Sequence, residues 1–336
     1  MRTHYYIIAA ALAALVFTSC EKVSPIGVLV SGTAVEDRVK MSHLYYQQYK
    51  NELEIKVADD EYTFIVGGDS HVTTDPGRMD EMLAIGLQNN DLLYAHLGDI
   101  ADTKAEYYIV LDSLIEEAKK RYINKYYDVD KNNPDKYTLK SDPQQSYLYS
   151  EITFPFFPVV GNHDLTHNGW ALWSNIFHSS FYEFPVIVTN RETGAVEADR
   201  FIFLDTASGT MGQEQINLIE EGVLDGSDGI PYRHTFVFSH TNIFRPSSTQ
   251  FASTFPREET FFLLNQFAHW NCSIVFCGHV HAWDEREFEG VTYLTLDSMS
   301  ERNSPEPGDY LVRVHVKNDG SLTWEKVHMN YTAKKK

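Results

Sequence analysis

Five apolar runs in this 336-residue chain each end in a short motif rich in Asp, His and Asn. The central run, residues 91–97, ends at Gly98-Asp99. A short apolar run closed by glycine is typical of a buried strand. Side chains at the carboxyl ends of parallel strands gather at one sheet edge, where α/β proteins bind ligands. The other four motifs are Gly68-Asp69-Ser70-His71, Gly161-Asn162-His163-Asp164, Ser239-His240 and Gly278-His279-Val280-His281.

The order of the expected elements favours a parallel-sheet core. A strand is expected at 61–66, then a helix over about 77–89, then the strand before Asp99, and this order is typical of parallel pairing. A capping-box spacing from Thr33 to Glu36 predicts a helix reaching about residue 50. Further helices are expected at 103–124, 169–177, 213–221 and 258–270. Further strands are expected at 154–160, 200–204, 234–238, 273–276, 291–296, 310–316 and 321–328, with Asn318-Asp319-Gly320 as a hairpin turn.

Residues 126–150 interrupt this order. They are rich in Lys, Asp, Asn and Tyr and contain two prolines, so no regular element is expected there. A long loop inside a compact domain is often functional. Because it lies between two site-forming strands, it is either a flap over a substrate pocket or a solvated surface loop.

Composition excludes several classes of function. The formal net charge of -19 argues against nucleic-acid binding through a broad basic surface. No phosphate-binding glycine-rich loop occurs, so nothing indicates a nucleotide cofactor. Cys272 and Cys277 flank an expected strand, too far apart to form a disulfide, and we expect both to be buried. Without a Cys-x-x-Cys pair, a zinc–thiolate site is excluded as well.

The first residues form a targeting segment that lies outside the fold. Arg2 precedes an apolar core, residues 5–17, that is too short to span a bilayer. The core ends in Phe17-Thr18-Ser19-Cys20, which resembles a bacterial lipoprotein signal with Cys20 as the lipidated residue. An ordinary cleaved signal peptide is the alternative, and both imply export to the periplasmic or cell-surface side. We therefore expect a signal peptide at 1–19, a membrane tether and helix at 20–58, and one domain at 59–332.

The residues at the strand ends have the chemistry of a metal site. Hard oxygen ligands mixed with imidazoles, and no thiolate, suit Mn, Fe or Zn. Two carboxylates and four histidines exceed the needs of one ion, and with Asp99 shared they suffice for two. Two ions together polarise a phosphoryl oxygen and generate a hydroxide nucleophile. The candidate set is Asp69, His71, Asp99, Asn162, His240, His279 and His281.

These motifs, in this order, resemble those of the calcineurin-like metallophosphoesterase superfamily. The pattern is Asp-x-His, Gly-Asp-x-x-Asp, Gly-Asn-His-Asp, His and Gly-His-x-His, over roughly residues 62–329. The resemblance implies an α/β fold in which two mixed β-sheets pack face to face with helices outside. It also implies hydrolysis of a small phosphomonoester or phosphodiester by metal-activated hydroxide.

The resemblance assigns a role to each residue. One metal would take Asp69, His71, His281 and the bridging Asp99, and the other would take Asp99, Asn162, His240 and His279. His163 would contact the phosphate and protonate the leaving group, with Asp164 orienting it. Asp102 would support a ligand rather than bind metal.

Departures from the pattern narrow the subfamily. Purple acid phosphatases have glycine in place of His71 and a tyrosine in place of Asp102. Protein serine/threonine phosphatases have different residues after Asp102 and after His163, and the large 5′-nucleotidases add a domain for which this chain is too short. What remains is the single-domain hydrolases of small phosphoesters, with the choice between monoester and diester open.

An exported lipoprotein that uses the same fold only as a binding module, without metal, is the alternative function. His96 lies inside an apolar strand and is expected to be a packed core histidine. Arg245 and Arg286 follow two of the motifs, where a phosphate-binding arginine would be useful, but we assign both to the surface.

Overall fold

The computed structural model describes residues 32–57, 61–102, 104–190, 193–226, 231–244 and 255–331. The targeting segment and Cys20 lie outside the described residues. Within them, no helix has the length and apolar character needed to cross a membrane.

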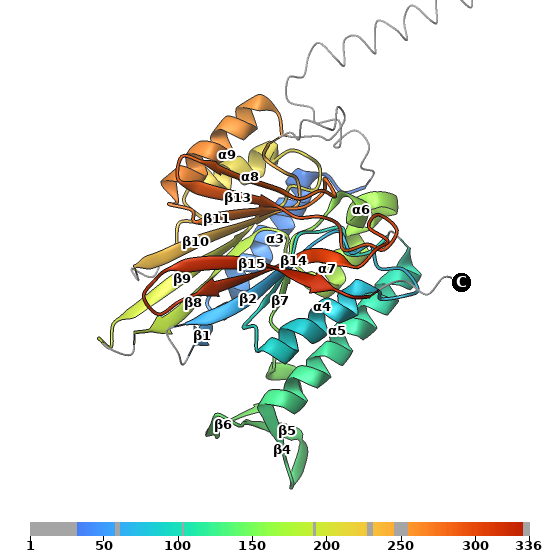
Figure 1. The fold of residues 1–336 in the computed structure, drawn as a ribbon, viewed down its shortest axis with the longest axis vertical. Helices are drawn as coiled ribbons and strands as arrows, with labels where there is room; N and C mark the ends of the chain where they lie inside the picture. Colours follow the sequence, from blue (N-terminus) through green and yellow to red (C-terminus); the bar gives the residue numbers. More distant parts are fainter. Residues whose placement is uncertain are drawn as a thin grey trace, which may run out of the picture.

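Two mixed β-sheets pack face to face, with helices on the outside (Figure 1). The predicted fold class is therefore confirmed. The larger sheet has the strand order β1-β8-β9-β10-β11-β13-β12, and the smaller has the order β15-β14-β2-β3-β7. The strands of the larger sheet are β1 (Ile55–Val57), β8 (Tyr182–Thr189), β9 (Val196–Phe203), β10 (Tyr232–Ser239), β11 (Ile274–Cys277), β12 (Asp284–Phe288) and β13 (Val291–Thr295). Those of the smaller are β2 (Tyr62–Gly67), β3 (Tyr94–His96), β7 (Phe156–Pro158), β14 (Gly308–Val316) and β15 (Leu322–Met329).

The helices cover the outer faces of the two sheets (Figure 1). One group lies over the larger sheet: α3 (Val35–Tyr49), α8 (Gly212–Glu220) and α9 (Arg257–His269). The other lies over the smaller sheet: α4 (Arg78–Asn89), α5 (Ala105–Tyr126) and α7 (Trp170–Phe177). The described residues also contain three helical segments of about one turn each: η1 (Tyr149–Glu151), α6 (Asn162–Leu165) and η2 (Thr166–Asn168).

Alternate residues of β2 contribute to two separate cores. Phe64 belongs to the core between the sheets, where its ring lies edge-on to Phe201 at 5.1 Å and to Phe236 at 5.0 Å. Ile65, which points the other way, belongs to the core under α4 and α5. Because β2 is buried on both faces, it is apolar nearly throughout, as expected for a strand in parallel pairing with β3.

The carboxyl ends of the parallel strands determine where a site can form. In the smaller sheet β2, β3 and β7 run parallel, and in the larger β9, β10, β11 and β13 do so. The five polar motifs follow β2, β3, β7, β10 and β11. They therefore meet along one edge of the sandwich, where the two sheets approach each other.

Residues 126–150 form a structure that the sequence did not predict. They contain a three-stranded antiparallel sheet, β4 (Tyr127–Asp130), β5 (Asn133–Leu139) and β6 (Asp142–Leu148). Figure 1 shows this sheet at the far end of α5. The 22 residues of α5 span about 33 Å, and Asp102 precedes the other end of the helix. Of the two alternatives, the surface position fits and the flap over the pocket does not.

The capping box expected at the start of α3 was wrong, although the helix has the expected extent. The N-cap residue is Ala34, and no side chain caps the helix. The carboxylate of Glu36 instead accepts hydrogen bonds from the backbone N–H groups of Gln213 and Glu214 at the start of α8. The charge thus stabilises the N-terminus of a neighbouring helix rather than its own.

The strand β8 was missed because Pro185 lies in its middle. A proline cannot donate to a sheet, and its presence usually argues against an inner strand. Here β1 pairs only with residues 186–188, so Pro185 has β9 as its partner and lies beyond the end of β1.

Both Cys272 and Cys277 are buried and free, as expected, and burial raises the pKa of Cys277 to about 12.

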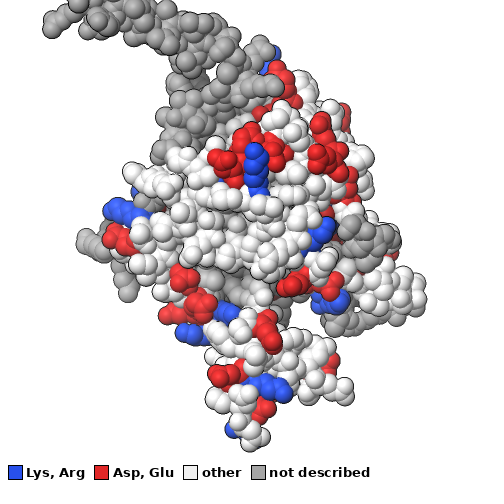
Figure 2. Space-filling view, turned by 180° about the vertical axis from the view of Figure 1, so that it is seen from behind, with Lys and Arg blue, Asp and Glu red and all other residues white. Residues whose placement is uncertain are grey.

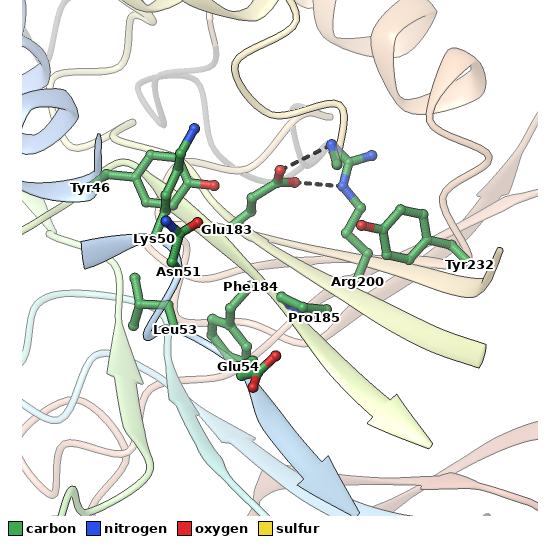
Figure 3. Close-up of a pocket in the computed structure, with 11 residues that line it drawn as sticks. Tyr46, Lys50, Asn51, Leu53, Glu54, Glu183, Phe184, Pro185, Arg200 and Tyr232 are labelled. Atoms are coloured by element: carbon green, nitrogen blue, oxygen red, sulfur yellow. Dashed lines mark hydrogen bonds and ion pairs between the residues drawn. The ribbon is translucent and has the colours of Figure 1, made fainter. Parts of the chain in front are cut away.

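A cavity of about 200 Å³ lies between α3, β8 and β9 (Figure 3). Within it the carboxylate of Glu183 accepts hydrogen bonds from Arg200 Nε at 2.6 Å and from the backbone of Gly226 at 3.1 Å. The guanidinium also lies over the ring of Trp270. A buried carboxylate needs such partners, and none of the cavity's residues belongs to the polar motifs. We therefore treat this pair as part of the scaffold.

Candidate metal centre

The structure brings the candidate ligands of both sheets together. Asp69 and His71 follow β2, Asp99 follows β3, and Asn162 begins the single turn after β7. His240 follows β10, and both His279 and His281 follow β11. Two groups of side chains that could each hold a metal ion share Asp99. These groups are Asp69, His71, Asp99 and His281, and Asp99, His240 and His279.

Asp99 lies between the two groups. Its Oδ2 is 3.9 Å from Nε2 of His71 and 3.6 Å from Nε2 of His240. In the first group, Nε2 of His281 is 3.2 Å from Oδ1 of Asp69. Two ligands on one ion, each about 2.1 Å from it at a tetrahedral angle, lie about 3.4 Å apart. The observed separations fit ligands that converge on a cation.

His71 has an unpartnered nitrogen that indicates a missing partner. Its Nδ1–H donates to Oδ1 of Asp102 at 3.0 Å, so the neutral ring offers a lone pair at Nε2. That Nε2 is buried and has no hydrogen-bond partner among the described residues. An unsatisfied buried polar atom is costly. A metal ion at this position would satisfy it, and the carboxylate on Nδ1 is the usual support of a ligating histidine.

The contact between His240 and Asn162 is a second test of whether the cluster is arranged around a metal ion. Nδ1–H of His240 donates to the carbonyl of Leu97 at 2.7 Å, so the neutral ring again has its lone pair at Nε2. This Nε2 lies 2.9 Å from Oδ1 of Asn162, which is also an acceptor. A metal ion bound by both atoms would satisfy these two acceptors. Asn162 lies where it could join the second group of ligands.

The backbone at the site is held in a sparsely populated conformation. Five candidate ligands have φ between +46° and +69° in the left-handed region: Asp69, His71, Asp99, His279 and His281. Asp and His tolerate this region better than most residues, but each instance still costs on the order of 1–3 kcal/mol. Such conformations cluster at functional sites, where the side-chain direction matters more than local stability.

For Asp69 and His279 the surroundings favour the metal-binding form, whereas for His71 and His281 the hydrogen bonds to Asp102 and Asp69 outweigh burial and raise the pKa. Burial alone would raise the pKa of Asp69, but the hydrogen bond from His281 and the nearby imidazoles outweigh it and hold that pKa well below its usual value. Burial, followed by the charge of His240, lowers the pKa of His279 to about 4. A carboxylate and a neutral imidazole are the forms that bind metal.

Hydrogen bonds across the two sheets fix the positions of the ligands. The backbone N–H of His279 donates to the carboxylate of Asp69, and the ring of His240 bonds to the strand before Asp99. Within the smaller sheet, the backbone N–H of His71 also donates to the carbonyl of Asp99 at 3.0 Å. Neither sheet can therefore move at this edge without disturbing ligands that belong to the other.

Gly161 allows the third motif to lie directly against Asp99. A Cβ at this position would be 2.1 Å from the backbone nitrogen of Asp99 and 2.2 Å from its Oδ1. Such contacts cannot be relieved by a side-chain rotation, because one partner is backbone. Only glycine fits between the two motifs.

We expect Gly161→Ala to inactivate the protein more than it destabilises it. Overpacking costs about 1–3 kcal/mol, whereas a displacement of about 1 Å at a reacting centre can cost about 10²-fold in rate. Bound metal and phosphoester hydrolysis, measured beside the free energy of unfolding, check this. Gly194→Ala is the control for a glycine away from the site: its φ of +71° makes alanine strained, but an added Cβ meets no described residue within 4 Å, so stability can fall while metal content and activity stay unchanged. Full metal content and full activity in Gly161→Ala would contradict the assigned contact.

Asp102 connects two histidines to an arginine that the sequence analysis missed. Besides accepting from His71, its Oδ1 lies 3.7 Å from Nδ1 of His163, and its Oδ2 accepts from Arg302 Nη1 at 2.8 Å. His71, Asp102 and His163 also form a third group close enough to hold an ion. Since Asp102 is already paired with Arg302, we treat it as a support for the two rings.

Asp164 contacts the backbone around Asp99 rather than the ring that it was expected to orient. Its Oδ1 accepts from the backbone N–H groups of Ile100 and Ala101 and from the hydroxyl of Tyr108, and its Oδ2 accepts from Gly161. Burial and the nearby charge of Asp99 raise its pKa to about 7. These hydrogen bonds place Asp164 as the residue that holds the second and third motifs together, while Asp102 is the carboxylate beside His163.

No protein-family profile and no curated protein matches this chain. Among solved structures, it is similar to GAP50, the anchor in the inner membrane complex of Plasmodium, with 11% identity, a TM-score of 0.49, and coverage of 82% of this chain and 90% of that one. It is similar to a dimetal phosphatase from Danio rerio, with 13% identity, a TM-score of 0.47, and coverage of 81% and 99%. Vacuolar Protein Sorting 29 from Cryptosporidium parvum gives 11% identity, a TM-score of 0.34, and coverage of 80% and 98%. These similarities are too distant to assign an activity.

His96 is a core histidine, as expected, and it joins two of the motifs. It is fully buried, and burial lowers its pKa to about 3, so the ring is neutral. Nδ1 accepts from the backbone N–H of Gly98, and Nε2–H donates to Ser70 Oγ at 3.0 Å. The serine in turn donates to the carbonyl of Ile100 at 2.9 Å. This chain of hydrogen bonds fixes the turn between Asp69 and His71 against the turn at Asp99.

The loop after β13 also contributes to the site, and no motif predicted it. Ser298 Oγ and the backbone N–H of Ser300 both donate to the carbonyl of Asp69. Arg78, which is buried, donates to the carbonyls of Met299 and Ser304 in the same loop. The loop is thereby held where Arg302 reaches Asp102.

Of the two arginines considered from the sequence, Arg286 pairs with Asp284, and Arg245 lies outside the described residues.

Proposed function

We propose that this chain is a phosphoesterase that uses two divalent metal ions, Mn, Fe or Zn, to hydrolyse a small phosphomonoester or phosphodiester. The observation that carries the proposal is the position of Asp99, whose Oδ2 faces nitrogens of both metal-holding groups at 3.9 and 3.6 Å. One ion would be held by Asp69, His71, Asp99 and His281, and the other by Asp99, Asn162, His240 and His279. When bound, such a pair supplies Lewis acidity toward a phosphoryl oxygen and a hydroxide nucleophile near neutral pH.

The chain's own residues would handle the leaving group. The side chain of His163 is 44% exposed, so a ligand can reach it, while its Nδ1 is nearest to Asp102. We assign proton donation to the other ring nitrogen, Nε2. Asp102 would hold the ring through its negative charge, and Arg302 would hold Asp102. The backbone N–H of His163 donates to Asp99 Oδ1 at 2.7 Å, which ties the acid to the metal cluster.

The surface charge is consistent with a small substrate rather than a nucleic acid. On the face shown in Figure 2, basic side chains lie singly or in small groups among acidic ones. A nucleic-acid backbone is bound through many adjacent cations. A single phosphoester at the metal cluster needs no such surface, because bound dications supply the local positive charge.

A substrate panel with the metal controlled tests the function. Purified protein would be assayed on p-nitrophenyl phosphate, alkyl phosphates, bis(p-nitrophenyl) phosphate, cyclic nucleotides and pyrophosphate, before and after chelation and with added Mn, Fe or Zn. We expect hydrolysis that is lost with the metal and restored by it, and the panel decides between monoesters and diesters. Protein that holds no metal and cleaves none of the panel would favour the binding module over the enzyme.

We further propose that the protein is exported and anchored to a bacterial membrane through a lipid on Cys20, on the periplasmic or cell-surface side. The support is the sequence alone: an apolar core too short to span a bilayer, followed by Phe17-Thr18-Ser19-Cys20. A lipid-modified cysteine would keep the catalytic domain near the membrane through residues 21–31 without a transmembrane helix.

Cys20→Ser is expected to convert a membrane-associated protein into unprocessed precursor or soluble protein, with activity per molecule unchanged. Membrane fractionation and mass spectrometry of the N-terminal peptide measure this, with Cys272→Ser, a buried cysteine far along the chain, as the control for loss of a thiol. An N-terminal peptide of the wild-type protein without an acyl chain would exclude the anchor.

A further inference from the structure

A cavity of about 290 Å³ lies next to the candidate metal centre. It is formed by the turn after β2, the loop after β13 and the residue Tyr331 near the end of the described chain. Two of its lining residues, His71 and Arg302, also belong to the site. The cavity is therefore continuous with the cluster, whereas the cavity in Figure 3 is not.

The cavity begins on the side of the cluster where a leaving group would receive its proton. The ring of His163 packs edge-on against His71, with 4.7 Å between the centroids. Asp102 contacts His71, lies beside His163 and pairs with Arg302. The ring of His163 thus lies beside His71, at which the cavity starts.

Two carboxylates, those of Asp75 and Glu301, are among the residues that line the cavity. Asp75 accepts hydrogen bonds from the hydroxyl of Tyr331 at 2.8 and 2.9 Å and from the backbone of Gly77 at 3.0 Å. Glu301 accepts from the backbone N–H of Arg78 at 2.8 Å. These donors are all neutral, and among the described ion pairs none includes Asp75 or Glu301.

Arg302, which also lines the cavity, pairs with Asp102 rather than with Asp75 or Glu301. Arg302 forms a two-pronged contact with Asp102, at 2.8 and 3.3 Å, so its charge is directed toward the catalytic side. A carboxylate accepts hydrogen bonds readily from alcohol O–H groups. It repels a second carboxylate or phosphate placed beside it.

We propose that this cavity binds the leaving group of the substrate, and that it takes a neutral alcohol with two or more hydroxyl groups, of the polyol or sugar class. This inference rests on the proposed phosphoesterase function. Asp75 and Glu301 accept hydrogen bonds from the hydroxyl groups, and the same two carboxylates disfavour leaving groups that carry an additional anionic group. The chemistry at phosphorus itself is unaffected by this assignment.

Three phosphates with the same three-carbon skeleton test the inference: glycerol 3-phosphate, n-propyl phosphate and 3-phosphoglycerate. They differ in having two hydroxyl groups, none, or one hydroxyl and a carboxylate. We expect kcat/KM to be about tenfold higher for glycerol 3-phosphate than for n-propyl phosphate. We expect kcat/KM for n-propyl phosphate to be at least about tenfold higher than for 3-phosphoglycerate. Dissociation constants from calorimetry on metal-loaded His163→Ala protein, which is expected to turn over slowly, provide a second readout and should follow the same order.

Variants that remove the charge but keep an acceptor oxygen identify the responsible residues. The double variant Asp75→Asn with Glu301→Gln should reduce the preference for glycerol 3-phosphate over 3-phosphoglycerate by about tenfold or more. Asp128→Asn, which removes the same kind of charge on β4 at the far end of α5, should leave the preference unchanged.

The outcomes separate the two proposals. Hydrolysis of p-nitrophenyl phosphate without any ranking of the three esters, in rates or in dissociation constants, would overturn the leaving-group assignment alone. A preference for 3-phosphoglycerate, or a double variant with the wild-type ranking, would overturn it as well. Failure to cleave or bind any of these esters in the presence of metal would overturn the proposed function, and the assignment with it.

Discussion

Asp99→Asn is expected to lose at least one of the two metal ions and to lose more activity than Asn162→Ala or His71→Ala. The asparagine keeps the shape of the side chain and an acceptor for the backbone N–H of His163. It removes the negative charge that lies between the two groups of ligands, and two dications repel each other strongly without it. Changing a residue that only supports a ligand typically costs about 10–100-fold, so a shared ligand should cost more.

The control for this change is Asp112→Asn, which removes an exposed carboxylate from α5 and touches none of the motifs. It should leave the metal content and kcat at the wild-type values. Elemental analysis after gel filtration and initial rates on p-nitrophenyl phosphate give both quantities. Unaltered metal content in Asp99→Asn would show that Asp99 does not bridge.

The second large effect is expected for His163→Ala, with metals retained. An alkoxide is a poor leaving group, and a positioned acid that protonates it contributes typically about 10²–10⁴-fold. p-Nitrophenolate leaves without a proton. The variant should therefore slow the hydrolysis of alkyl phosphates by that factor and the hydrolysis of p-nitrophenyl phosphate far less. Single-turnover rates on both substrates avoid interference from slow product release.

Two further variants sharpen the assignment. His167→Ala removes an exposed imidazole from the adjoining turn and should change neither rate. Asp164→Asn should slow both substrates, because an amide nitrogen would face backbone donors and disturb the turn at Asp99 rather than the acid alone. Equal slowing of both substrates by His163→Ala would mean that this residue binds the phosphoryl group and is not the acid.

The sequence predicts the layout of the candidate site because its signal is local. Each candidate ligand follows an apolar run that is typical of a buried strand. Parallel strands place their carboxyl ends together. Asp69 and His279 come from motifs about 210 residues apart, yet the backbone of one donates to the carboxylate of the other. The pattern of strands in the sequence was enough to predict that these two residues lie at the same sheet edge.

What the sequence could not predict depends on contacts without a local pattern. Arg302 lies in a loop with no motif, and its place beside Asp102 depends on Arg78, which holds that loop from α4. Asp164 was expected to hold a histidine ring, but four donors from three segments surround its carboxylate instead. The strand β8 was missed because its proline lies beyond the end of a short edge strand, a fact that only the sheet order reveals.

The most direct test of the central claim is the number of divalent metal ions per chain in the wild-type protein, measured together with its activity. Protein purified without chelators would be analysed by inductively coupled plasma mass spectrometry, and anomalous scattering would locate the ions in crystals. The account predicts two ions per chain, one on each side of Asp99, with phosphoester hydrolysis that rises in proportion to the second ion bound. An active protein that holds no transition metal, or a single ion remote from Asp99, would contradict it.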